Sequence, residues 1–351
     1  MIRIDEIYYN VFVKAVQRLN RPVACHWFYP FGSTDFRQMC NEPLISDADL
    51  RIVFWDQEPA YQDRVQRFMD EYIHIYNECR QIIVTSEKNS QDLDWACNTY
   101  GLEPNYYFFH GWAALDWYRG YDHTFLADAW SDRTLTRRIF CPNNIVGGRR
   151  EHRLRVLDAF ARRNLIVNNH ISFPDVCPYE NKSTRELMRG HGLTLPDDLS
   201  LPLIIDDDRN HANDSHSINF WDQATESFCH VVTETVYDST RIHLTEKTFK
   251  PIVLEQPFLL VAPRGSLEYL RSYGFQTFGD LWDENYDHAS DQDRINAIAD
   301  VCAEINAWTP SQLKDAQYHA DAIVKHNKRW FYGGFQDLLW QELTGMINSW
   351  H

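Results

Sequence analysis

Two Thr-Glu pairs in the second half of the chain are well suited to binding chemistry. Thr233-Glu234-Thr235 follows an apolar segment at 229–232, and Thr245-Glu246-Lys247 begins an amphipathic segment that ends near Gln256. A helix N-terminus has unpaired N–H groups and a partial positive charge, so it attracts phosphate, and Lys247 adds a full charge. Glu234 and Glu246 can accept hydrogen bonds from ribose or sugar hydroxyls. The corner therefore suits a nucleotide-sugar. The structural alternative is that Thr245 caps the helix, Glu246 favours its dipole and Lys247 faces solvent.

The sequence around these pairs alternates between strand and helix. Apolar runs at 229–232 and 257–262 predict two strands, separated by a loop that contains Arg241 and by the helix from Thr245 to Gln256. A further helix is expected after Ser266. This order is typical of a parallel α/β sheet, and such sheets bind ligands at the edge where their strands end. Arg241 is therefore included among the residues that could bind the nucleotide-sugar.

A glycine- and arginine-rich loop follows the strand expected at 138–140. Gly147 and Gly148 allow a close approach of the backbone to a ligand. Arginine binds phosphate through a planar fork, so Arg149, Arg150 and Arg153 are candidate diphosphate ligands. The alternative is a basic, solvated helix face.

Asp206-Asp207-Asp208 follows an apolar run at 201–205 that predicts a strand. Its carboxylates could hold Mg²⁺ or Mn²⁺ as an Asp-x-Asp element does. Acidic clusters are also common as caps and turns at strand ends. We expect no metal in the protein and keep a metal site formed by Asp206 and Asp208 as an alternative.

Three polar residues of the N-terminal third are candidates for a catalytic base. Asp56 and Glu58 follow an apolar strand expected at 49–55, and His110 follows another at 105–109. A carboxylate or an imidazole at a strand end could take the proton of an attacking hydroxyl. Glu58 could instead cap the helix that begins at Pro59.

Several of these segments resemble known glycosyltransferases. The resemblance is carried by the motifs VVTET, LTEKTFKPI and QPFLLVAPRGSLEYLRSYGFQTFGDLWDENYD, by CPNNIVGGRREHRLRVLDAFARRNL at 141–165 and by LPLIIDDD at 201–208. Over residues 137–290 the chain looks like the donor-binding half of GT-B glycosyltransferases. It is especially similar to a family of phage and bacterial glycosyltransferase-like proteins. It is more distantly similar to fucosyltransferases, in which a Thr-Glu-Lys helix start contacts the donor nucleotide.

The resemblance implies an enzyme, a hexosyl- or pentosyltransferase. It would move a sugar from a nucleotide-sugar to a hydroxyl acceptor without a metal or another cofactor. Lys247, Arg150 and helix N-termini would stabilise the departing diphosphate. The acceptor would be a glycan or a hydroxymethylated base in phage DNA. A rival reading is a non-catalytic binding protein on a glycosyltransferase scaffold.

The expected architecture is α/β, with two Rossmann-like domains and a helical C-terminal tail. An acceptor-side domain is expected at 1–130 and a donor domain at 137–290, with a polar linker near 128–136. The tail at 291–351 is expected to pack across the domains, and 310–347 reads as one long helical stretch.

Length, charge and cysteine content limit the kinds of protein and ligand that the chain can represent. The chain has 351 residues, a net charge of −16 and eight scattered cysteines without a CxxC pair. We expect reduced, buried thiols. No apolar run approaches 18 residues and the start lacks a signal peptide, so the expectation is a cytoplasmic protein without a membrane span, in the host cell if the protein is phage-encoded. The acidic charge disfavours DNA binding, although Arg137–Arg163 contains a basic cluster. The sequence does not predict an oligomeric state.

Overall fold

The computed structural model describes residues 22–28, 37–40, 48–55, 59–72, 79–122, 130–205, 220–238 and 240–350. These residues form two compact units. The first unit contains the described residues through Asp116, those from Thr240 to His243 and those from Gly334 onward. The second contains the described residues of 117–239 and of 244–333.

A five-stranded sheet organises the first unit. Its order is β2-β1-β3-β4-β5, in which β1, β3, β4 and β5 are parallel and β2 pairs antiparallel with β1. The strands are β1 (Val23–Phe28), β2 (Arg37–Cys40), β3 (Leu50–Trp55), β4 (Arg80–Thr85) and β5 (Leu102–Tyr106). Every residue of β3 is buried, including the charged Arg51, and its other five residues are apolar, as expected of a central parallel strand.

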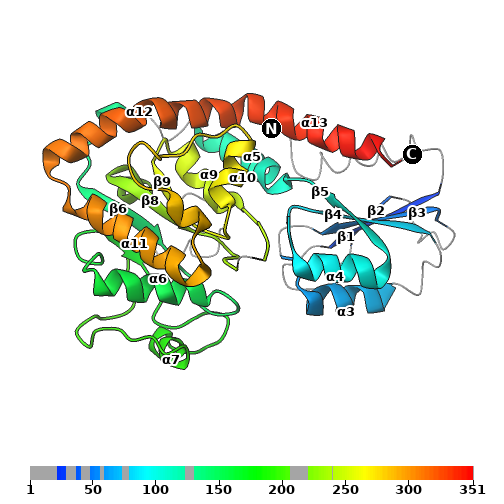
Figure 1. Cartoon of the computed structure of the whole chain (residues 1–351), viewed down its shortest axis with the longest axis horizontal. Coiled ribbons are helices and arrows are strands. Elements are labelled where there is room, and N and C mark those ends of the chain that lie inside the picture. Colours follow the sequence, from blue (N-terminus) through cyan, green and yellow to red (C-terminus); the bar gives the residue numbers. More distant parts are fainter. Residues whose placement is uncertain are drawn as a thin grey trace. The chain divides into compact units, whose positions relative to one another are not determined.

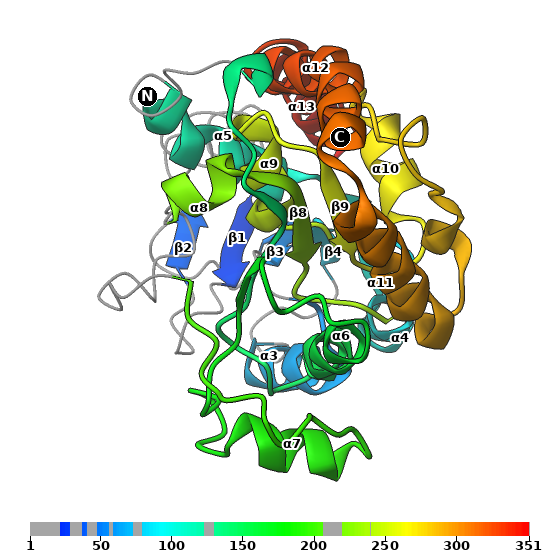
Figure 2. The same cartoon turned by 90° about the vertical axis from the view of Figure 1, so that its left-hand side faces the viewer.

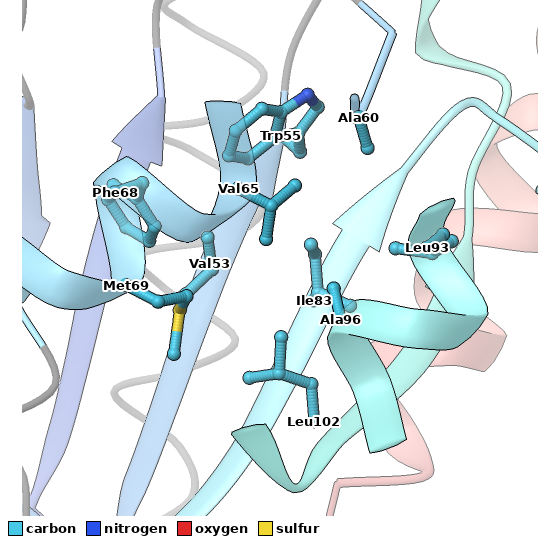
Figure 3. Close-up of a cluster of buried hydrophobic side chains, with 10 residues drawn as sticks. All are labelled: Val53, Trp55, Ala60, Val65, Phe68, Met69, Ile83, Leu93, Ala96 and Leu102. Carbon is cyan, nitrogen blue, oxygen red and sulfur yellow. The ribbon is translucent and has the colours of Figure 1, made fainter. Parts of the chain in front are cut away.

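Two helices cover one face of this sheet. In α3 (Gln62–Tyr72), Val65, Phe68 and Met69 are buried at helical spacing, and α4 (Gln91–Tyr100) adds Leu93 and Ala96. Figure 3 shows these side chains meeting those of β3 and β4. The hydroxyl of Ser90 caps α4, and Gly101 ends it in the left-handed conformation with φ of 66°.

The first unit also contains helices from two distant parts of the sequence. They are the N-terminal half of α5 (Phe109–Asp122) and all of α13 (Gly334–Asn348). Gly111 lets them approach closely, because a Cβ there would lie 2.4 Å from Cζ of Phe335. The indole rings of Trp112 and Trp340 meet edge to face with centroids 4.9 Å apart.

The second unit has a four-stranded parallel sheet in the order β7-β6-β8-β9. Its strands are β6 (Arg137–Pro142), β7 (His170–Ser172), β8 (Ser227–Thr233) and β9 (Phe258–Val261). Its longer helices are α6 (Glu151–Arg162), α9 (Glu246–Val253), α11 (Asp291–Ala307) and α12 (Pro310–Tyr332). Shorter helices are η3 (Trp130–Asp132), α7 (Thr184–Gly190), α8 (Trp221–Thr225), α10 (Ser266–Ser272) and η5 (Asn285–His288).

Helices cover both faces of the second sheet. α6 connects β6 to β7 and α9 connects β8 to β9, so the two crossovers run in opposite directions along the sheet. Right-handed crossovers in opposite directions place their helices on opposite faces. In Figures 1 and 2, α6 lies beside α11 on one face, and α9 lies with α12 on the other.

The α/β class, the two largely parallel sheets and the helical C-terminal region confirm the coarse expectation. Some details were wrong. Residues 201–205 form no strand, because Leu203 makes only an isolated bridge to Phe173. The strand expected through Phe109 ends at Tyr106. The expected long helical stretch is two helices that separate at Gly333.

The six cysteines whose side chains the structure describes are free thiols. Cys141, Cys177, Cys229 and Cys302 are buried, and Cys79 and Cys97 are partly buried. Burial raises the pKa of Cys141 to about 12 and that of Cys97 to about 11, so these thiols stay protonated at neutral pH. In the described part of the chain, no helix has both the length and the apolar character needed to span a bilayer.

Candidate functional site

The carboxyl ends of β6 and β8 mark the candidate site in the second unit. The connections that leave these neighbouring strands diverge, one to β7 and the other to β9. Such a switch point in an open α/β sheet forms the usual ligand crevice. Thr233, the last residue of β8, donates a hydrogen bond from its hydroxyl to Oδ1 of Asn143, which follows β6, over 2.6 Å. The two strand ends are therefore joined directly.

Glu234 organises the start of α9. Its carboxylate is fully buried and accepts hydrogen bonds from the N–H of Thr245 over 3.1 Å and from the hydroxyls of Thr245 and Thr248, each over 2.6 Å. The N–H of Thr235 adds a contact of 3.3 Å. These donors use the acceptor positions that we had expected Glu234 to offer to ribose or sugar hydroxyls. In this structure Glu234 therefore holds the Thr-Glu-Lys corner in place.

Lys247 supplies a cation at the same corner. Its ammonium group lies 2.9 Å from Oε1 of Glu246, 3.1 Å from Oγ1 of Thr245 and 3.3 Å from Oγ1 of Thr235. The Lys247 side chain is 29% exposed, whereas Glu246 is buried. A cation in the first turn opposes the helix dipole, which favours negative charge there. An anionic ligand would relieve this opposition, and Lys247 retains the exposure needed to meet one.

Arg153 links the loop after β6 to the end of β8. Its guanidinium donates to the carbonyl of Ile145 in the loop after β6, over 2.7 Å, and to those of Thr233 and Glu234 at the end of β8, over 3.0 and 3.2 Å. Burial and the nearby charge of Arg150 lower the pKa of Arg153 to about 10. The Arg153 fork is therefore largely committed to backbone carbonyls.

His152 supports the same loop. Its Nε2 lies 3.0 Å from the carbonyl of Glu234, so Nε2 carries the proton and donates it. Its ring stacks on Tyr237, with centroids 5.2 Å apart. Burial holds the pKa of His152 well below its usual value, so the imidazole is neutral at physiological pH.

The glycine loop after β6, which contains Gly147 and Gly148, lies beside the carboxylate of Glu180. The N–H of Gly148 donates to Oε1 of Glu180 over 2.7 Å, and a Cβ on Gly147 would lie 2.4 Å from the same oxygen. Arg149 is exposed and has φ of 71°. Arg150, just before α6, is partly exposed and lies over the ring of Tyr179 at 5.6 Å. Among the predicted arginine ligands, Arg149 and Arg150 keep the greater exposure.

Arg241 belongs to the first unit and not to the sheet edge of the second that carries the other candidate residues. Its guanidinium donates to the buried carboxylate of Glu87 over 2.9 Å and to Asp92 over 2.5 Å, and it lies 4.8 Å from the ring centroid of Tyr61. Ile242 and Lys88 exchange backbone hydrogen bonds beside it. Arg241 is thus buried in an ion-pair cluster that pins residues 240–243 into the first unit.

The candidate base residues fall into two groups. His110 lies in the first turn of α5 instead of at a strand end, is 1% exposed, and meets His243 edge to face at 5.0 Å. Asp56 and Glu58 lie outside the described residues, as do Asp206, Asp207 and Asp208. Among the described residues, no group of three or more His, Cys, Asp or Glu side chains is placed to hold a metal ion.

The sequence had pointed to Glu234, Thr245, Glu246, Lys247, Arg150 and Arg153, and the structure brings all six to one sheet edge. It had not pointed to Thr248, Asn143 or Glu180. Thr248 lies three residues after the Thr245 cap, a spacing that places it on the same side of the first turn. The roles of Asn143 and Glu180 depend on contacts to distant parts of the chain, at β8 and at the glycine loop respectively.

Comparisons of the chain with protein-family models, with curated proteins and with solved structures found no match.

Proposed function

We propose that the chain is a GT-B-type glycosyltransferase with two Rossmann-like domains, and that the second unit binds a nucleotide-sugar. The observation that carries this proposal is the partly exposed Lys247 at the N-terminus of α9, beside the carboxyl end of β8 at the switch point of the sheet. The strand order of the second unit and its helices on both faces agree with a nucleotide-binding sheet.

The charges at this edge suit a diphosphate. Lys247, in the first turn of α9, approaches from one side, and Arg150 stands at the start of α6 on the other. Burial and the charge of Arg150 lower the pKa of Arg153, whereas the carboxylates of Glu234 and Glu246 raise it. Arg153 on α6 is therefore close enough to both carboxylates to interact with them electrostatically. Glu246 and Glu234 keep Lys247 and the start of α9 in position. These groups need little rearrangement when negative charge develops on a leaving group.

The proposed reaction breaks the bond between the sugar's anomeric carbon and the diphosphate oxygen. The acceptor hydroxyl forms the new glycosidic bond, and the bonding electrons leave with the nucleoside diphosphate. Lys247 and Arg150 would stabilise this developing negative charge. In an inverting reaction, Asp56 or Glu58 would take the hydroxyl proton; the near-complete burial of His110 makes it a poorer candidate. The acceptor class stays a glycan or a hydroxymethylated DNA base, and metal independence is part of the proposal.

Binding of nucleotides tests the donor site directly. Ligands that bind only the folded protein raise its melting temperature. We expect a nucleoside diphosphate to raise the melting temperature equally with Mg²⁺ and with EDTA, and Lys247→Met to remove most of that shift. Lys325→Met is the matched control, because Lys325 is 32% exposed and also forms an ion pair, with Asp321 on α12.

The alternatives give different results. A shift that requires Mg²⁺ would favour the metal-dependent enzyme with Asp206 and Asp208. Binding without sugar transfer to any acceptor class would favour the non-catalytic binding protein. If no nucleotide shifts the wild-type melting temperature, the proposed donor site is wrong.

A further inference from the structure

An exposed aromatic side chain stands beside the proposed diphosphate site. Tyr179 is 61% exposed, and the guanidinium carbon of Arg150 lies 5.6 Å from its ring centroid. Tyrosine has a large apolar body, so such exposure leaves ring surface that a flat ligand could cover. The arginine and the ring together offer one cationic and one aromatic contact within a short distance.

The turn that carries Tyr179 is fixed at several points. The N–H of Cys177 donates to the carbonyl of Lys182 over 2.9 Å, and the N–H of Asn181 donates to that of Cys177 over 3.0 Å. Cys177 itself is fully buried. The capping box of Ser183 and Glu186 fixes the chain immediately after the turn. The ring of Tyr179 is thus presented by an ordered turn, which reduces the entropy lost when a ligand binds.

The same turn is attached to the glycine loop after β6. Glu180 accepts a hydrogen bond from the N–H of Gly148 over 2.7 Å. The ring also lies close to this loop, because a Cβ on Gly148 would be 3.9 Å from Cδ2 of Tyr179. Arg150 follows two residues later, and Arg153 reaches the carbonyl of Glu234 from the first turn of α6. Tyr179 therefore stands at the sheet edge that holds the diphosphate-binding candidates.

We propose that Tyr179 stacks on the base of the bound nucleotide while Arg150 contacts its phosphates. This inference rests on the proposed nucleotide site and names a subsite within it. A nucleobase is the favoured occupant because every base has a flat π face, and stacking on an aromatic ring requires no base-specific hydrogen bonds. The cation and the ring match the two chemically distinct halves of a nucleotide.

Calorimetric titration separates the base contact from the phosphate contact. ADP, GDP, CDP, UDP and inorganic pyrophosphate are titrated into the wild type and into Tyr179→Ala, Tyr179→Phe and Val176→Ala. Val176 is the matched control, because it is exposed on the same segment. We expect Tyr179→Ala to weaken the best-bound nucleoside diphosphate by about 5- to 150-fold, as loss of one stacked base does. Tyr179→Ala should bind pyrophosphate with nearly the wild-type affinity. Tyr179→Phe and Val176→Ala should bind the nucleoside diphosphate with nearly the wild-type affinity.

Other results would overturn the inference in distinguishable ways. Equal losses for pyrophosphate and nucleotide would mean that Tyr179 acts by holding Arg150. Unchanged nucleotide affinity in Tyr179→Ala would remove the stacking subsite and leave the proposed function standing. If the wild type binds neither nucleotides nor pyrophosphate, the subsite and the proposed function both fail.

Discussion

At the scale of single residues, Glu234 and Lys247 have complementary tasks. Glu234 is buried and receives hydrogen bonds from the start of α9, whereas Lys247 stays partly exposed and keeps a charge available for a ligand. A buried carboxylate with all its acceptor positions filled makes a rigid support. The chemistry of the site is therefore assigned to the exposed cations, and the buried anion positions them.

A second buried residue makes stability depend on pH. His230 lies in β8 against Phe140, and burial, with a contribution from the charge of Lys250, lowers its pKa to about 3. Unfolded histidine has a pKa near 6.5, so between these values the unfolded state binds more protons and stability falls as pH falls. Lowering the pH from 7 to 5 should cost about 2 kcal/mol of unfolding free energy through this residue alone.

His230→Gln should remove that part of the pH dependence, which urea unfolding at pH 7 and pH 5 will measure. His152 is also buried and neutral, so a smaller dependence should persist in the variant. His288→Gln, at an exposed position, should retain the full wild-type dependence. Equal pH dependence in wild type and His230→Gln would contradict the expected neutral state of His230.

At the scale of elements, close packing explains features that propensity does not. Gly111 lies inside α5, although glycine is a poor helix former. The absence of a side chain at Gly111 makes room for the ring of Phe335 in α13. Gly111→Ala should destabilise the first unit by about 1–3 kcal/mol, because the added methyl group overlaps the Phe335 ring. Gly345 in α13 is the matched control: it has open space around it, so Gly345→Ala should stabilise by about 0.5–1 kcal/mol. Urea unfolding of both variants checks the opposite signs; stabilisation by both would contradict the packing.

Local patterns in the sequence predicted most of the elements and part of the site. The apolar runs of β3, β8 and β9 were recognisable because a short run of apolar residues is a local signal. The run at 201–205 was misleading, since apolar residues alone do not supply a strand with a partner. The use of Glu234 as a support depends on Thr248 turning toward it, and the burial of Arg241 depends on Glu87 and Asp92, more than 140 residues earlier in the sequence. Such contacts leave no local signal.

At the scale of the whole molecule, each unit is assembled from separated segments. The first unit takes residues 240–243 and the final helix, so its completeness depends on the end of the chain. In α13, Phe335, Leu339 and Leu343 are buried, and Glu342 accepts a hydrogen bond from the N–H of Phe108. Burial of each large apolar side chain contributes about 1.5–3 kcal/mol, so three of them amount to much of a typical domain's stability.

Truncation after Gly333 should therefore loosen the first unit and spare the second. We expect amide hydrogen exchange to become faster in β3 and β4, because the truncation removes α13, which packs against α5 in the same unit. Protection in β8 and β9 should remain, because α9, α11 and α12 are all retained. Gly345→Ala in the full-length chain controls for changes confined to α13. Equal loss of protection in both sheets would show that the two units unfold as one, and unchanged exchange in β3 and β4 would show that α13 adds nothing to the first unit.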